Sequence, residues 1–391
     1  MKVLFYLPVV TSWWFDNIVE PLIRRLSDTA EVTVLAPKPW RGTGLGEREL
    51  ARCVDLPNVR WCIMDGPDHP STRTRPRAAT EMIAFVQDLA PDFVFCRSAD
   101  CETVKAFPGT IRFLMEGGVS PFKLPDHWIM LQEQPLDQGL LPPLEQSARD
   151  CLMRAIEPAW SKLRQRHCHA PAGREVILAA AGLPSDRPIL LLPLEYDHEE
   201  NFFAMHRACP RPNHRLVKDM ADRLRGRFTL ALTNHPLNQL YVDNSALEAA
   251  VAKAGGTTVL LPPTIDGMSS TLALAPHVDG LIVHDSKAFA LAPLCGTPLL
   301  RRSHFAGGDW LSAYADLESF LKAIESGSAN VAEESSARLW TAFHLANNAF
   351  DPKDPTLTAA EILDRAASSL QPRRWDASLN RVRAVLPELF K

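Results

Sequence analysis

The sequence lacks any apolar run of about 18 residues, so it offers no candidate membrane-spanning helix. Its first residues, 1–8, have neither the apolar core nor the cleavage site of a signal peptide, and we expect them to form a β-strand. The eight cysteines include no CxxC pair, which predicts free thiols in a reducing compartment. Together these absences predict a cytoplasmic protein.

Two phosphate-binding fingerprints are also missing. Neither GxGxxG nor GxxxxGK[ST] occurs, which argues against an NAD enzyme, an ATPase or a kinase. The nearest glycine cluster, Gly42–Gly46, lies in a polar stretch that is typical of a flexible loop. A net charge of −4 at pH 7 gives no general reason to expect nucleic-acid binding.

What the chain does contain is a repeated alternation of strands and helices. Its 391 residues, 46% of them hydrophobic, are too many for one ordinary core and suggest two domains. The predicted strands are 2–8, 31–35, 59–63, 92–96, 111–115, 188–193, 228–232, 257–261, 280–283 and 297–300. The predicted helices include 16–26, 78–89, 145–169, 215–224, 245–254, 268–275 and 286–295, and the chain after residue 310 is mainly helical.

This pattern predicts an α/β fold with two Rossmann-like domains that face a cleft. We expect a first domain over 1–170, which includes an ordered loop over the Pro- and Gln-rich stretch 121–143. A linker near 170–173 leads to a second domain over 171–350. Helices over 351–391 form an extension that packs back towards the first domain.

The second half carries polar residues where two predicted strands end. Asn234, His235 and Pro236 follow strand 228–232, and Ser286 opens a helix after strand 280–283. Ligands bind at the carboxyl ends of parallel strands, and an imidazole beside a helix N-terminus suits a phosphate. As alternatives, His235 is a loop histidine bonded to backbone and Ser286 is a plain N-cap, with Asp285 and Lys287 solvated.

The first half offers a carboxylate and two tryptophans at strand ends. Glu116 follows strand 111–115 and precedes two glycines, which permit close approach of a ligand. Such a carboxylate can act as a general base, and the alternative is a Glu solvated in a glycine turn. Trp13 and Trp14 follow the first strand and could stack on sugar rings, or pack at the start of a helix.

Two polar clusters contain residue types that can bind metal ions. Glu195, Asp197, His198 and Glu199 follow strand 188–193, but their spacing matches no zinc pattern, so we interpret them as a polar loop. His167, Cys168 and His169 sit at a helix end and are expected to point in different directions. We therefore predict neither a metal ion nor another cofactor.

These motifs together resemble GT-B glycosyltransferases. More narrowly, the chain resembles capsule-type Kdo transferases and GT-B sialyltransferases, which use CMP-activated acidic sugars. Met115-Glu116-Gly117 takes the place of the family's acidic motif, and His235-Pro236 matches its His-Pro motif. Ser286, Ala290 and Gly296-Thr297-Pro298 match its phosphate turn. Two departures concern the donor: Met115 replaces one of two acids, and Asp285-Ser286-Lys287 replaces a turn with two hydroxyls.

The resemblance implies transfer of a sugar from a nucleotide, such as Kdo from CMP, to a surface-polysaccharide or glycolipid acceptor. It implies that the domain over 1–170 binds the acceptor and that the domain over 171–350 binds the nucleotide sugar. It also implies Glu116 as the catalytic base, with an inverting or a retaining outcome left open. The implied donor-binding residues are Asn234, His235, Pro236, Ser286, Lys287 and Glu195. The implied acceptor-binding residues are Trp13, Trp14 and Asp16.

Two other classes of function stay open at this stage. One is an enzyme of the same fold that uses a UDP-sugar, either another transferase or an epimerase. The other is a non-catalytic sugar- or nucleotide-binding component. Peripheral association with the inner membrane or with an assembly complex is a further expectation.

Overall fold

The chain forms two compact units, each built on its own β-sheet. The computed structural model describes residues 1–56, 58–168, 173–198, 201–208 and 210–390. Unit 1 comprises residues 1–118, 124–137 and 343–385, and unit 2 comprises 119–123, 138–342 and 386–391. Unit 2 thus begins well before the expected boundary at 171, and helix α6 (Gln146–His167) belongs to it.

Unit 1 has a doubly wound sheet with the strand order β3-β2-β1-β4-β5-β6. Its strands are β1 (Lys2–Tyr6), β2 (Glu31–Pro37), β3 (Val59–Met64), β4 (Phe93–Cys96), β5 (Thr110–Glu116) and β6 (Ile129–Gln132). All neighbours pair in parallel except β5 and β6, which are antiparallel. The predicted loop over 121–143 was therefore wrong in part, because the short apolar run of β6 finds a partner only at the edge of the folded sheet.

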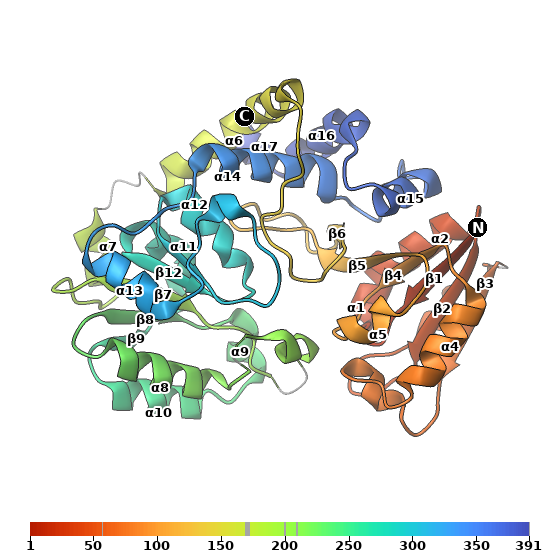
Figure 1. Cartoon of the computed structure of the whole chain (residues 1–391), viewed down its shortest axis with the longest axis horizontal. Coiled ribbons are helices and arrows are strands. Elements are labelled where there is room, and N and C mark those ends of the chain that lie inside the picture. The colour runs from red at the N-terminus through yellow and green to blue at the C-terminus, as the bar shows by residue number, and fades with distance from the viewer. Residues whose placement is uncertain (57, 169–172, 199–200, 209, 391) are drawn as a thin grey trace. The chain divides into compact units, whose positions relative to one another are not determined.

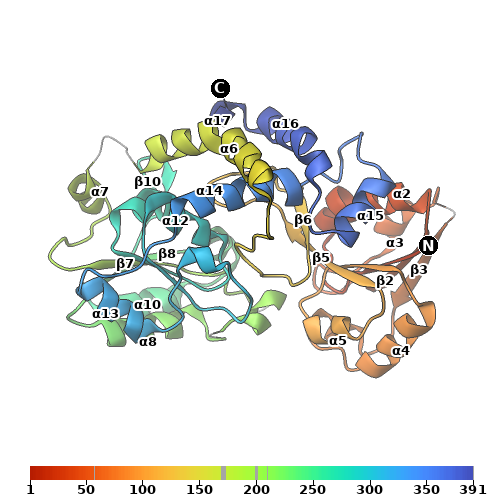
Figure 2. The same cartoon turned by 45° about the horizontal axis from the view of Figure 1, so that its top comes forward.

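The helices of unit 1 cover both faces of its sheet, with α2 and α4 on opposite sides (Figures 1 and 2). The α- and π-helices of unit 1 are α1 (Ser12–Trp14), a π-helix (Phe15–Val19), α2 (Glu20–Ser27), α3 (Glu47–Ala51), α4 (Ala79–Leu89), α5 (Cys101–Lys105), a second π-helix (His344–Asn348), α15 (Ala359–Ala367) and α16 (Trp375–Val385). Phe5 of β1, Leu22 of α2 and Ile362 of α15 share one buried core. The C-terminal residues 343–385 thereby complete the core of unit 1.

Unit 2 has a parallel sheet with the order β13-β12-β7-β8-β9. Its strands are β7 (Ile189–Pro193), β8 (Thr229–Thr233), β9 (Thr258–Leu260), β12 (Gly280–Val283) and β13 (Leu299–Arg301), with a hairpin of β10 (Thr264–Ile265) and β11 (Met268–Ser269). Ile189 and Leu191 enter one core, whereas Leu190 and Leu192 enter another. Burial on both faces explains why β7 reads as a continuous apolar run.

Helices flank both faces of this second sheet. The α-helices of unit 2 are α6, α7 (Arg174–Ala180), α8 (Asn213–Leu224), α9 (Pro236–Tyr241), α10 (Ser245–Ala254), α11 (Ser270–Leu274), α12 (Leu291–Cys295), α13 (Leu317–Glu325), α14 (Glu334–Phe343) and α17 (Pro387–Phe390). Helices α8 and α10 lie together on one face, and α11 and α12 lie on the other (Figures 1 and 2). The predicted helix 268–275 was too long, because Met268 and Ser269 pair in the hairpin instead.

The fold class predicted from the sequence is confirmed, since both units are doubly wound α/β structures. In each sheet the strand order reverses direction once. The reversal lies between the neighbouring strands β1 and β4 in unit 1, and between β7 and β12 in unit 2. Ligands of open α/β sheets bind at such switch points, outside the carboxyl ends of the strands. The candidate ligand-binding segments are therefore 7–11 and 97–100 in unit 1, and 194–198 and 284–286 in unit 2.

Candidate functional site

In unit 2 the switch point holds a buried ion pair. The Oε2 atom of Glu195, just after β7, lies 2.7 Å from Nε of Arg207, whose side chain is 8% exposed. The other oxygen of Glu195 accepts a hydrogen bond of 3.1 Å from the backbone N–H of Asp285, just after β12. One carboxylate therefore connects the two loops that flank the switch point.

Asp285 and His284 contribute buried polar atoms beside this pair. The Asp285 side chain is 8% exposed and its Oδ1 accepts a 2.5 Å hydrogen bond from Ser303. Burial raises the pKa of Asp285 to about 6, against the opposing effects of Ser303 and Arg301. The alternative that Asp285 is solvated was therefore wrong, because its side chain is buried and Ser303 donates a hydrogen bond to it.

His284 is 4% exposed, and its tautomer follows from its neighbours. Its Nδ1 lies 3.3 Å from the carbonyl oxygen of Arg302, which can only accept, so Nδ1 carries the proton. Burial lowers the pKa of His284, which favours the neutral ring with a lone pair on Nε2. Neither Nε2 of His284 nor Oδ2 of Asp285 has a hydrogen-bond partner among the described residues. Buried polar atoms without a partner are uncommon in folded proteins, so this pair marks the switch point as a candidate ligand site.

His235 caps helix α9 next to the same loops. Its Nδ1 accepts the backbone N–H of Leu237 at 3.2 Å, so in the neutral ring the proton lies on Nε2. Burial lowers the pKa of His235, and its ring lies 5.6 Å from that of Tyr196, in the loop after β7. The structure thus shows a capping role and leaves Nε2–H as a donor.

The remaining donor-site candidates differ in their hydrogen bonds and in their exposure. Asn234 bonds Asn244 through Nδ2 at 2.9 Å and Asn238 through Oδ1 at 2.8 Å, so its side chain holds the loop together. Ser286 caps the 3₁₀ helix Lys287–Ala290 by accepting the N–H of Ala288 at 3.2 Å. Pro236 is exposed as the first residue of α9, and Lys287 is half-buried.

In unit 1, Glu116 ends β5 beside a buried arginine. Its Oε1 lies 3.3 Å from a terminal nitrogen of Arg97, and the two side chains are 44% and 6% exposed. Arg97 also donates to the carbonyl of Leu114 at 3.2 Å and lies 3.7 Å from the ring centre of Trp14. Burial lowers the pKa of Arg97, while the charge of Glu116 acts in the opposite direction. A buried guanidinium therefore orients the Glu116 carboxylate.

The glycine directly after Glu116 is required by close packing in the folded sheet. A Cβ on Gly117 would come within 3.0–3.2 Å of the backbone of Ile129 in β6. Gly117 also donates to Trp128 at 2.8 Å, and its carbonyl lies 2.6 Å from Nε2 of His344. The sequence predicted close approach of a ligand at this glycine, and the structure places the backbone of strand β6 there.

The acceptor-site candidates lie in the first helical turns after β1. Trp14 is 8% exposed and stacks with Arg97, which favours the packing alternative, whereas Trp13 is 46% exposed. Asp16 lies 2.6 Å from Arg48 and 3.5 Å from Arg52. Its carboxylate is engaged in ion pairs on the surface of unit 1.

Sequence reasoning missed two arginines that organise these clusters. Arg97 directly follows the predicted strand 92–96, so its position at a strand end was a usable signal. Arg207 carries no such signal, since it lies in an irregular stretch after the 3₁₀ helix Phe202–His206. Asp197 accepts the backbone N–H of Asn213 at 2.6 Å, in keeping with a polar loop. Glu199 and His169 lie outside the described residues.

The described residues contain no group of three or more His, Cys, Asp or Glu side chains arranged to hold a metal ion. None of the described helices combines the length and apolar character needed to span a membrane.

Comparisons with known proteins give matches at the level of structure alone. No family model and no curated protein matches the sequence. The solved structures similar to this chain include KpsC of Thermosulfurimonas dismutans, described as a beta Kdo 2,7 transferase, with 11% identity and a TM-score of 0.46 over 85% of this chain and 98% of that one. Its beta Kdo 2,4 transferase matches with 11% identity and a TM-score of 0.41 over 87% and 89%.

A third similar structure has a different activity. The UDP-GlcNAc 2-epimerase of Methanocaldococcus jannaschii matches with 13% identity and a TM-score of 0.29 over 93% of this chain and 98% of its own. Glycosyltransferases and a sugar-nucleotide epimerase are thus both among the similar structures. At these scores the fold assignment rests on the strand order of the two sheets.

Proposed function

We propose that this chain is a GT-B glycosyltransferase that binds a nucleotide sugar in unit 2 and a glycan or glycolipid acceptor in unit 1. The observation that carries the proposal is the polar cluster at the β7/β12 switch point, where Glu195 pairs with Arg207 and where His284 and Asp285 keep unsatisfied buried atoms. The hydroxyls and the phosphate of a nucleotide sugar need hydrogen-bonding partners, and a polar cluster at a switch point is where an α/β sheet offers them.

The donor we propose is a CMP-linked acidic sugar such as CMP-Kdo. His235 would donate from Nε2 to the phosphate, and the Ser286 hydroxyl would donate to the same group. Lys287 would supply positive charge near the anionic donor, and Glu195 holds Arg207 beside the same loops. A single phosphate can be bound by such groups without a metal ion, and no cofactor enters the proposal.

The reaction we propose is direct attack by an acceptor hydroxyl on the anomeric carbon of the donor. The bond from that carbon to the phosphate oxygen breaks, CMP leaves, and Glu116 takes the hydroxyl proton. Glu116 suits this role because it is 44% exposed at a strand end while Arg97 fixes its orientation. Trp13 offers an exposed ring for the acceptor sugar. We place this reaction in cytoplasmic assembly of a surface polysaccharide.

The test is nucleotide binding followed by turnover. Calorimetric titration of the full chain with CMP, UDP and GDP should show the tightest binding for CMP, and His235→Ala should weaken it. His277→Gln is the matched control, because His277 precedes β12 at the opposite end of the strand and should leave binding unchanged. Tightest binding of UDP would favour the UDP-sugar transferase or epimerase instead. Binding of CMP without hydrolysis or transfer of any CMP-sugar would favour a non-catalytic role.

A further inference from the structure

Unit 2 contains two cysteines whose sulfur atoms lie in contact. Cys168 is the C-cap of helix α6, and Cys295 is the last residue of α12, which packs against α6. Their Sγ atoms are 3.5 Å apart, although the two residues are separated by 127 positions in the sequence. Both thiols are free, and both residues are partly exposed. The fold thus forms a dithiol that the scattered spacing of the cysteines does not reveal.

The ends of the two helices hold this dithiol together. The backbone N–H of Cys168 donates to the carbonyl of Arg164 at 2.7 Å, which continues the hydrogen bonding of α6. The Sγ atom of Cys168 also lies 3.4 Å from the carbonyl oxygen of Leu294, the residue before Cys295. A pair of thiols that is already in contact meets the first requirement of a disulfide, that the two sulfurs can reach each other.

The surroundings of the two thiols make Cys168 the more acidic. The hydrogen bond with Cys295 lowers the pKa of Cys168, and the charge of Arg164, one helical turn away, acts in the same direction. Burial and the charge of Glu334 oppose this lowering of the pKa. The same hydrogen bond, together with burial, raises the pKa of Cys295. Cys168 therefore loses its proton first, and a thiolate is the form of cysteine that attacks an oxidant.

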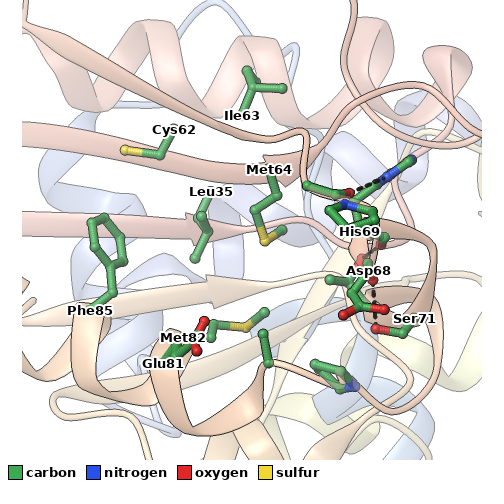
Figure 3. Close-up of a pocket in the computed structure, with 15 residues that line it drawn as sticks. Leu35, Cys62, Ile63, Met64, Asp68, His69, Ser71, Glu81, Met82 and Phe85 are labelled. Carbon is green, nitrogen blue, oxygen red and sulfur yellow. Dashed lines mark hydrogen bonds between the residues drawn. The ribbon is translucent and has the colours of Figure 1, made fainter.

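A metal site and a lone thiol are the alternatives to a redox pair. Structural zinc sites take four ligands, whereas the described residues offer no group of three or more His, Cys, Asp or Glu around these two sulfurs. Cys62 of β3 exemplifies a lone thiol: it lines a pocket of unit 1 whose described lining contains no second cysteine (Figure 3). Oxidised Cys62 has no resolving thiol in that pocket, whereas Cys168 has one in contact.

We propose that Cys168 and Cys295 form a reversible dithiol–disulfide couple that is oxidised by peroxides. The Cys168 thiolate attacks one oxygen of hydrogen peroxide, the O–O bond breaks, and the second oxygen leaves as hydroxide, which the proton released from Cys168 converts to water. The sulfur of Cys295 then attacks the sulfenic acid on Cys168, and the hydroxyl group leaves with the Cys295 proton as a second water. Two thiols are oxidised to one disulfide, and one peroxide is reduced to two waters.

The couple is independent of the proposed transfer reaction. It shares no residue with the donor or acceptor clusters described above, and it can be measured without a nucleotide sugar. Its failure and that of the proposed function are therefore distinguishable. In the reducing compartment that the sequence predicts, the dithiol is the resting form, and a thiol reductant would regenerate it after oxidation.

The experiment maps the thiols before and after oxidation. The full chain is freed of metal with a chelator and treated with hydrogen peroxide, the remaining thiols are alkylated, and the tryptic peptides are analysed by mass spectrometry. We expect alkylation of Cys168 and Cys295 to be lost together and replaced by a crosslinked pair of peptides, while Cys62 remains alkylated. Dithiothreitol should restore both thiols.

Variants assign the two steps. Cys295→Ser should stop the reaction at the sulfenic acid of Cys168, which dimedone traps, whereas Cys168→Ser should leave Cys295 alkylated. Cys151→Ser is the matched control, because Cys151 is exposed on the same helix and its loss should leave the crosslink unchanged. Continued alkylation of both thiols in the wild type, a crosslink to a different cysteine, or faster oxidation of Cys62 than of Cys168 would overturn the proposal.

Discussion

Glu195 and Arg207 form the contact that organises the switch point of unit 2. The two side chains meet at 2.7 Å, and the second oxygen of Glu195 reaches the backbone N–H of Asp285 at 3.1 Å. Arg207 also donates to the carbonyl of Tyr196 and approaches Asp197 to 3.5 Å. The loops after β7 and β12 are thus held together by side chains, which fixes the polar groups of the candidate site before any ligand arrives.

Variants of His235 can distinguish its role as the N-cap of α9 from its proposed role in phosphate binding. His235→Ala should weaken CMP binding by about 1.5–3 kcal/mol, or roughly 10–150-fold, because the Nε2–H donor to a charged phosphate is lost. His235→Asn should keep the cap of α9, since Asn is a favoured N-cap, and should still lose most of the affinity. Calorimetry and urea unfolding measure the two effects, and wild-type affinity in His235→Asn would remove His235 from the donor site.

Ser286 permits a similar distinction. Ser286→Ala should cost about 1 kcal/mol of unfolding free energy, because the cap on the N–H of Ala288 is lost. Ser286→Asp retains a capping oxygen but places a negative charge beside the phosphate, so stability should recover while CMP affinity falls further. If Ser286→Asp binds CMP as tightly as the wild type, Ser286 is a cap and nothing more.

Asp285 should make folding stability depend on pH. Its pKa of about 6 in the folded protein exceeds its ordinary value of 3.8, so the folded state binds more protons between these values. Its contribution to stability is therefore greatest below pH 3.8 and is lost as pH rises through 6, by about 3 kcal/mol in all. Asp285→Asn lacks this titration.

The measurement is urea unfolding of wild type and Asp285→Asn between pH 3 and pH 7. The stability of the wild type relative to the variant should fall over that range and level off above it. Comparison with the variant cancels the titration of the other carboxylates. A constant difference between the two proteins would mean that Asp285 titrates normally in the folded state.

Glu116 is the residue most closely tied to the proposed chemistry. Glu116→Gln keeps the size of the side chain but removes the proton acceptor, so transfer should fall by about 10²–10⁴-fold. CMP affinity should stay constant, because the proposed nucleotide site lies in unit 2. Glu102→Gln is a suitable control, since Glu102 is exposed in the same unit and pairs with Lys105. Retention of most of the transfer rate in Glu116→Gln would require another base.

The positions of the candidate residues were largely readable from the chain. Glu116, Glu195 and Ser286 each follow a run of apolar residues, and the periodicity of such runs is a local property that survives in the fold. The two doubly wound units follow from the same alternation, because strands buried on both faces need covering helices.

The sequence by itself determined the fold class and the strand ends at which polar residues emerge, since both depend on neighbours along the chain. Only the tertiary structure decided what those residues meet. Arg97 forms an ion pair with Glu116, and Arg207 forms one with Glu195, because the order of strands in each sheet brings distant loops to one edge. The burial of Asp285, the pairing of β6 with β5 and the unsatisfied Nε2 of His284 have the same origin, since burial and partnership depend on contacts that no local pattern encodes.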